Sequence, residues 1–146
     1  MRGRIWVVWN PSIINFTIIE TSAQHIHGQV DLQVSKVKFQ FTAVYGLHSI
    51  TVRTSLWKTI QQLSTQITES WLIMGDFNSI LTAEDRPIGS QVQLAETRDF
   101  QECINDCHLT ELPTVRRKFI WTNGQVFSRI DRALINVKWV LHMPIV

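Results

Sequence analysis

The chain has 146 residues, of which 45% are hydrophobic and 18% charged, and 14 Lys and Arg against 12 Asp and Glu leave a net charge of +2. This composition is typical of one globular domain and excludes a disordered chain, and so small a charge does not by itself indicate a partner. No apolar run reaches the roughly 18 residues of a membrane helix, and Asn10-Pro11 interrupts the apolar N-terminal stretch, which argues against a secretory signal.

The first third of the chain predicts an antiparallel sheet. We expect strands over residues 5–9 and 16–19, because both stretches are rich in β-branched and aromatic residues. Apolar residues then occupy even positions from Val30 to Val34 and odd positions from Val37 to Tyr45. Ser35-Lys36 therefore resets the parity, as a hairpin turn does.

The middle of the chain changes to a helical period. Apolar residues spaced three or four apart predict a helix from Val52 to Ile67, with Thr51 or Ser49 as its N-cap. A short buried strand follows at Trp71–Met74, and a second helix is expected from Leu94 to Cys107.

The last part predicts two strands, 118–122 and 128–135, joined by an Asn123-Gly124 turn, and then a short apolar segment, Val137–Leu141. This order of elements indicates a single α/β domain of the α+β type over residues 1–146. Its sheet is expected to be mainly antiparallel or mixed.

The two cysteines, Cys103 and Cys107, lie four residues apart and precede His108. A structural zinc site needs about four ligands, and the sequence offers no second cysteine pair. Phe100, Cys103, Ile104 and Cys107 instead follow the spacing of one helix face, so we expect reduced, buried thiols.

The stretch Trp71–Met74 ends abruptly in Gly75-Asp76-Phe77-Asn78. Gly75 permits a backbone conformation in which the strand stops sharply. Asp76 and Asn78 then follow the carboxyl end of a buried strand, which is where ligands bind in α/β sheets. The alternative is a simple turn, since Asp and Asn bond their own backbone.

Two other polar residues lie at or within predicted strands. Tyr45 ends one strand, and Asp131 lies inside an apolar strand, where a carboxylate is rare unless it is paired or functional. An ion pair of Asp131 with Arg129 or Arg132 is the structural alternative.

Four motifs occur in order along the chain: VYG…R..LW from Val44, MGDFNSIL…EDR..G from Met74, FIWTNG from Phe119 and SRIDRAL from Ser128. Together they resemble the endonuclease/exonuclease/phosphatase superfamily. Within it, the chain is most similar to the apurinic-endonuclease-like domain of plant LINE-type (non-LTR) retrotransposons.

The resemblance implies a four-layer sandwich of two mainly antiparallel β-sheets flanked by helices, and Mg²⁺-assisted hydrolysis of DNA phosphodiesters. It also implies roles for four residues. Asp76 would orient or deprotonate the attacking water and contribute weakly to the metal, and Asn78 and Tyr45 would hold the phosphate. Asp131 would orient the catalytic histidine.

The same resemblance places Trp121, Arg86 and Arg129 near the groove that receives the nucleic acid. It implies DNA as the partner and a nuclear location, while the lack of a signal and of a membrane-length apolar run predicts an intracellular protein with no membrane partner. The unpaired sheet edges of a partial domain would favour self-association.

The sequence also departs from the family. The family's metal-binding glutamate lies on a strand before the segment that matches Arg4–Trp9, and Glu20 stands too late to replace it. The catalytic histidine belongs to an Asp-His pair beyond the segment that matches Trp139–Pro144, whereas His142 follows Leu141.

We therefore expect a domain truncated at both ends and inactive by itself. A non-catalytic nucleic-acid-binding remnant, or a phosphatase of the same superfamily acting on small or lipid phosphoesters, is the alternative. For His25, His27 and His48, a satisfied or surface histidine is favoured over a catalytic one.

Overall fold

The structure, a computed structural model, describes residues 4–112, 121–122, 127–128 and 130–143, and for residues 121–122 and 127–128 it describes the backbone alone. Six strands form one mixed sheet in the order β1-β2-β3-β4-β8-β5. Their bounds are β1 Ile14–Thr21, β2 His25–Leu32, β3 Lys38–Tyr45, β4 Trp71–Asp76, β5 Thr110–Glu111 and β8 Asp131–Ile135. The short strands β6 (Trp121–Thr122) and β7 (Phe127–Ser128) pair separately.

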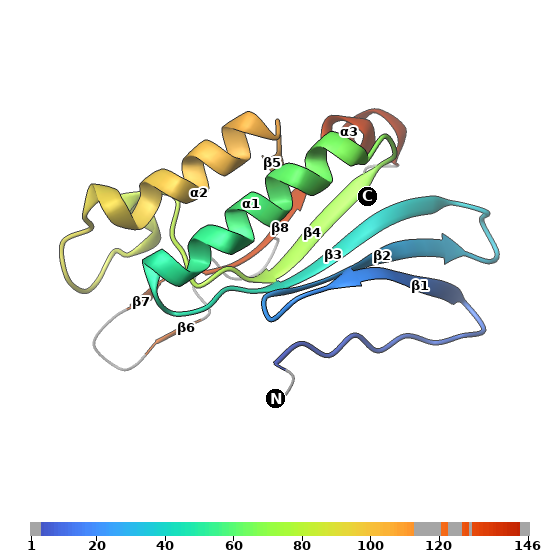
Figure 1. Cartoon of the computed structure of the whole chain (residues 1–146), viewed down its shortest axis with the longest axis horizontal. Coiled ribbons are helices and arrows are strands. Elements are labelled where there is room, and N and C mark those ends of the chain that lie inside the picture. Colours follow the sequence, from blue (N-terminus) through green and yellow to red (C-terminus); the bar gives the residue numbers. More distant parts are fainter. Residues whose placement is uncertain (1–3, 113–120, 123–126, 129, 144–146) are drawn as a thin grey trace.

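One pair of neighbours in the large sheet is parallel. β3 and β4 run in the same direction, joined by helix α1 (Ile50–Gln66), while the other pairs in this sheet are antiparallel. A parallel pair needs such a crossover connection. The carboxyl ends of β3 and β4 therefore lie at the same end of the sheet, beside the start of β8 (Figure 1).

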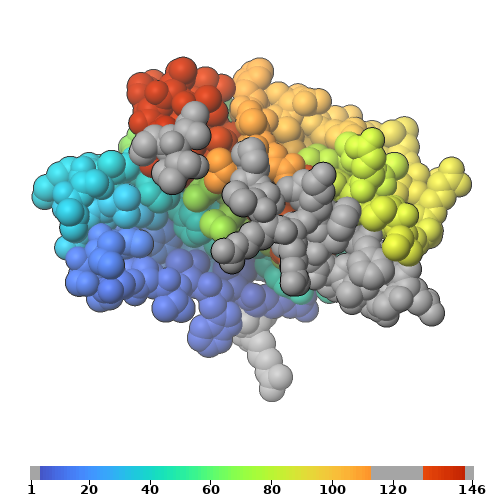
Figure 2. Space-filling view, turned by 180° about the vertical axis from the view of Figure 1, so that it is seen from behind, coloured from blue at the N-terminus to red at the C-terminus, as the bar shows by residue number. Residues whose placement is uncertain are grey.

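Helices α1 and α2 (Leu94–Asp106) lie side by side over one face of the sheet (Figure 1). A short 3₁₀ turn, η1 (Ala83–Asp85), precedes α2, and α3 (Val137–His142) follows β8. The front and rear views agree that β1–β3 form one side of the molecule and that α2, with the loop before it, forms the other (Figure 2). No helix in the described part of the chain is long and apolar enough to cross a membrane.

The core lies between the helices and the sheet. Each helix contributes a stripe and each central strand every second residue, as the two side-chain periods require. Its largest fully buried side chains include Leu56 and Ile60 of α1, Trp71 and Ile73 of β4, and Phe100 of α2. The alternation therefore sends one set of strand residues beneath the helices and the other set to the opposite face.

A three-ring stack fixes the two helices to the end of β4. Phe100 of α2 lies between Trp57 of α1 and Phe77, with ring centroids 4.7 Å and 4.9 Å apart. Phe77 is fully buried although it belongs to the polar Gly-Asp-Phe-Asn stretch. Such stacked aromatic pairs contribute about 0.5–1.5 kcal/mol each beyond the burial of their area.

Most of the predicted elements are confirmed. The antiparallel order of β1, β2 and β3 is observed, and Lys36 in the turn has a positive φ of 59°. Both long helices and the strand at Trp71 occur where expected, and Ser49 is the N-cap of α1, although its side chain makes no capping hydrogen bond.

Other expectations differ from the structure. The strand predicted at 5–9 is wrong, because residues 4–10 have no regular secondary structure. Within 128–135, the observed strands are the separate β7 and β8. The α+β class is confirmed, but the four-layer sandwich stays a prediction, since the described residues form one large sheet with α1 and α2 on one face. Residues 118–120 and the Asn123-Gly124 turn lie outside the described residues.

At Gly75, the backbones of β4 and β3 lie too close together to leave room for a side chain. Its φ is +142°, a conformation that side chains rarely adopt, and a Cβ at this position would clash with the carbonyl oxygen of Val44. The residue before Asp76 must therefore be glycine for the parallel pairing to continue to the end of the strand.

We predict that Gly75→Ala destabilises the fold by about 1–3 kcal/mol or more, because it adds both backbone strain and a clash. Gly89→Ala is the matched control, since Gly89 has a similar φ of +138° in an exposed loop. Urea unfolding measures both variants. An equal loss of stability in the two would show that backbone strain alone matters at Gly75.

Candidate functional site

Three of the predicted site residues form a row across neighbouring strands. Tyr45 at the end of β3 pairs with Asp76 at the end of β4, and Asp76 pairs with Asp131 at the start of β8. Residues directly opposite one another on paired strands point to the same side of the sheet. Tyr45, Asp76 and Asp131 therefore share one face and one end of the sheet.

This face is the one turned away from the helices. Val44, Ile73 and Leu134 belong to the core beneath α1 and α2, and the strand alternation sends the row to the other side. The N-terminal segment runs along this open face (Figure 1), where the guanidinium carbon of Arg4 lies 5.7 Å from the centre of the Tyr45 ring.

The fourth predicted residue, Asn78, joins the loops that follow β3 and β4. The amide of Gly46 donates to the carbonyl of Asp76 at 2.7 Å, and the side-chain nitrogen of Asn78 donates to the carbonyl of Gly46. Gly46 must be small, because a Cβ would clash with the carbonyl oxygen of Phe77. The two loops are thus fixed to each other.

The Asp76–Asn78 stretch is also a tight turn. The Oδ1 atom of Asp76 accepts a hydrogen bond from the Asn78 amide at 2.8 Å, and Asn78 has a positive φ of 48°. This is the turn chemistry that the sequence offered as the alternative. A backbone hydrogen bond holds the start of β8 beside this turn, since the Phe77 amide donates to the Ile130 carbonyl at 2.9 Å.

The two carboxyl groups of the row have perturbed proton affinities. Burial raises the pKa of Asp76, and this effect is opposed by the hydrogen bond from Asn78 and by the charges of His48 and Arg53. Burial also raises the pKa of Asp131, and the neighbouring negative charge of Asp76 raises it further. The pair therefore carries unfavourable negative charge, which attracts protons, cations or hydrogen-bond donors.

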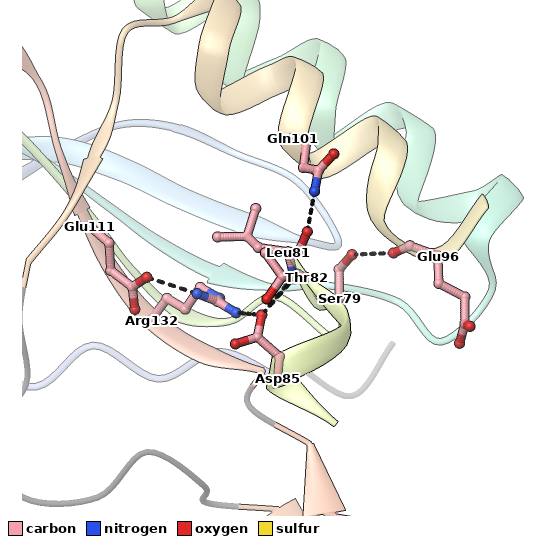
Figure 3. A network of polar contacts seen from close by, with 8 residues as sticks. All are labelled: Ser79, Leu81, Thr82, Asp85, Glu96, Gln101, Glu111 and Arg132. Carbon is pink, nitrogen blue, oxygen red and sulfur yellow. Dashed lines mark hydrogen bonds and ion pairs between the residues drawn. The ribbon is translucent and has the colours of Figure 1, made fainter. Parts of the chain in front are cut away.

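Of the two ion pairs that were the structural alternative for Asp131, the one with Arg132 is not formed, and the one with Arg129 lies outside the described residues. Arg132 follows Asp131 on the strand and points to the helix side, where it is bound by Asp85 and by Glu111 Oε2 at 2.8 Å (Figure 3). The Oδ2 atom of Asp85 also accepts from the amide of Leu81 at 2.9 Å. This network was not predicted from the sequence. Its two indications were the side-chain alternation along β8, which sends Arg132 to the helix side, and the EDR motif, which contains Asp85.

The remaining predicted residues are placed unevenly. Arg86 lies near Asn78, since both line one pocket, and its Nη2 is 2.9 Å from Glu96 Oε1. Of Trp121, the structure describes only the backbone, in β6, and Arg129 lies outside the described residues. The expectation that these three border a nucleic-acid groove stays a prediction.

Two of the histidines are satisfied inside the fold. His25 contacts the Ser22 hydroxyl at 2.6 Å and Glu20 at 2.9 Å, and the Nδ1 atom of His27 is 2.7 Å from the Thr42 hydroxyl. Both side chains are buried, whereas His48 is exposed. These positions agree with the structural interpretation of the three histidines.

The described residues do not provide a complete site for the expected Mg²⁺. Asp76 and Asp131 are two neighbouring carboxylates, but within the described ranges no group of three His, Cys, Asp or Glu residues is arranged to hold a metal ion. Cys103 and Cys107 are free and buried. Two carboxylates alone are a weak anchor for an ion that surrenders its waters reluctantly.

No protein-family model matches the sequence, and no curated protein matches it either. Solved structures do match. The endonuclease domain of TRAS1, a telomere-specific non-LTR retrotransposon, aligns with a TM-score of 0.67 at 11% identity, over 87% of this chain and 56% of that one.

Two further structures align with a TM-score of 0.51. An endonuclease/exonuclease/phosphatase family protein from Bacteroides thetaiotaomicron is 15% identical over 77% of this chain and 41% of its own. The human Nocturnin catalytic domain is 10% identical over 87% of this chain and 50% of its own. The chain spans about half the length of these structures, and within that span it has the fold of the endonuclease/exonuclease/phosphatase proteins.

Proposed function

We propose that this chain is part of a DNA endonuclease domain of the kind found in plant LINE-type retrotransposons, and that its Tyr45–Asp76–Asp131 row receives a phosphodiester group. The observation that carries the proposal is the register itself, which aligns a phenol and two carboxyl groups across three strands. The likeness to the TRAS1 endonuclease domain supports the same reading of the fold.

The row and Asn78 offer complementary chemistry to a phosphodiester. The Tyr45 hydroxyl and the Asn78 amide can each donate to a phosphate oxygen. Asp76, with its raised pKa, is suited to orient a water molecule and to accept a proton from it. Asp131 lies beside Asp76 and holds the negative charge against which a protonated histidine or a cation would be oriented.

Binding and cleavage separate in this proposal. The donors proposed to hold a phosphate, Tyr45 and Asn78, are among the described residues. The same residues include no group of three side chains that could hold a metal ion. We therefore propose that the chain by itself binds DNA weakly and does not hydrolyse it at the rate of a complete domain.

Substitutions within the row should change DNA affinity in opposite directions. We expect Tyr45→Phe to weaken the binding of a short DNA duplex about threefold to tenfold, because one phosphate hydrogen bond is lost. Asp131→Asn should strengthen binding, since it removes a negative charge beside the phosphate. Fluorescence anisotropy at two salt concentrations measures both. Unchanged affinity in both variants would contradict the placement of the phosphate at the row.

We predict that the chain does not nick supercoiled plasmid in the presence of Mg²⁺ or Mn²⁺. Loss of one member of a catalytic unit typically removes several orders of magnitude in rate. The assay compares the chain with its Asp76→Ala variant over a long incubation. Nicking by the chain that disappears in the variant would show that its own residues complete the site, and it would contradict the separation of binding from cleavage.

The paired carboxyl groups should also lower the stability of the fold at neutral pH. A carboxyl group whose pKa is raised by folding favours the folded state below its ordinary pKa, and this contribution is lost as the pH rises through the folded value. We therefore expect Asp131→Asn to raise the Tm by a few degrees at pH 7.

The gain in Tm should shrink as the pH falls and should vanish below about pH 3, where the carboxyl group is protonated in the folded and the unfolded state alike. Glu102→Gln, an exposed carboxylate on α2, is the control. A gain in Tm that is the same at both pH values would show that relief of charge is not its cause.

A further inference from the structure

A pocket of about 220 Å³ adjoins Asn78 on the side of the first turn of α1. It lies between the loop after β3, the start of α1, and the segment from Asn78 to α2. Its lining is rich in nitrogen donors. The residues that matter are His48, Ile50, Arg53, Asn78, Arg86 and Glu96.

Arg53 brings a positive charge to this pocket, and none of the ion pairs between described residues includes it. The residue is only 6% exposed, and its Nη1 donates to the carbonyl oxygens of Leu47 at 2.8 Å and His48 at 2.7 Å. A guanidinium stays charged at neutral pH, so a buried arginine bound only by carbonyls favours an anion nearby.

Among the charged residues that line the pocket one cation is in excess, although Asp76, Asp99 and Glu96 partly offset the charge of Arg53 from a longer distance. Arg86 is matched by Glu96, with 2.9 Å between Nη2 and Oε1, which leaves Arg53 in excess. The first turn of α1 contains no acidic residue, and Ser49 does not cap it with its side chain. The free amides and the dipole at the start of this 17-residue helix therefore add to the positive potential at Ile50.

We propose that this pocket binds a second phosphate group of a polynucleotide, adjacent to the phosphate received by the Tyr45–Asp76–Asp131 row. The inference rests on the proposed function for the identity of the ligand. Asn78 connects the two positions, because it lines the pocket and is bonded to Gly46, the residue after Tyr45. A ligand that fills both positions carries two phosphates, which favours a nucleic-acid strand over a phosphomonoester.

The test separates the two phosphate positions with two small probes. Thymidine carrying a phosphate on each side of its sugar can occupy both positions, whereas thymidine monophosphate can occupy one. Isothermal titration measures both affinities. We expect the bisphosphate to bind about tenfold more tightly than the monophosphate, the effect of one further charge-assisted contact.

Ile50→Glu is the decisive variant. Ile50 is 38% exposed at the first position of α1, where an acidic residue interacts favourably with the helix dipole and the fold is retained. The same charge repels a phosphate in the pocket. We expect the tenfold preference for the bisphosphate to disappear while the Tm is unchanged or higher. Gln62→Glu places the same charge on an exposed position of α1 away from the pocket and should leave the preference intact.

A second variant and a competitor complete the design. His48→Glu, on the exposed loop at the pocket, should abolish the same preference. If Ile50→Glu and Gln62→Glu have equal effects, or if malonate competes as well as pyrophosphate, the phosphate pocket is wrong. If Tyr45→Phe leaves monophosphate binding unchanged while Ile50→Glu still abolishes the preference, the row fails and the pocket stands. If Tyr45→Phe weakens monophosphate binding while Ile50→Glu leaves the preference for the bisphosphate intact, the pocket is rejected and the row stands.

Discussion

The buried charge of Arg132 is the constraint on which the arrangement of this domain depends. Its side chain is 1% exposed, and a buried cation without partners costs about 3–5 kcal/mol. Asp85, from the loop after β4, and Glu111, from β5 after α2, provide the compensating charges. Satisfying one guanidinium thus fixes three segments that lie far apart in the sequence, and Asp131 is covalently attached to the residue at their centre.

The sheet separates the groups that hold the fold together from the groups offered to a ligand. On β8, Arg132 points toward the helices and Asp131 toward the open face, and on β3 the same alternation separates Val44 from Tyr45. The repulsion between the carboxylates of Asp76 and Asp131 costs stability, and core packing on the other side of the same strands offsets that cost. The residues that stabilise the fold and the residues offered to a ligand are thus neighbours in the sequence but lie on opposite faces of the sheet.

Sequence patterns predicted the features that are local. The parity change at Ser35-Lys36 and the helical stripe of α1 are each properties of one segment, and so is the strand that begins at Trp71. Pairing between segments that are far apart in the sequence was harder to predict. Residues 5–9 have the composition of a strand, yet a strand also requires a hydrogen-bonding edge, and here Trp9 instead contacts Phe16 through its ring.

The same distinction applies to the site and to its motions. Tyr45, Asp76 and Asp131 could be proposed from strand ends, but the position of Arg53 beside a pocket depends on how α1 docks. Phe77, between Asp76 and Asn78, is locked into the ring stack with α1 and α2. A local opening of this loop would break the ring contacts with both helices, so we expect its amides to exchange slowly with solvent. We therefore expect the Asp76–Asn78 loop to keep its shape on binding, so that the conformational adjustment would be made by the ligand.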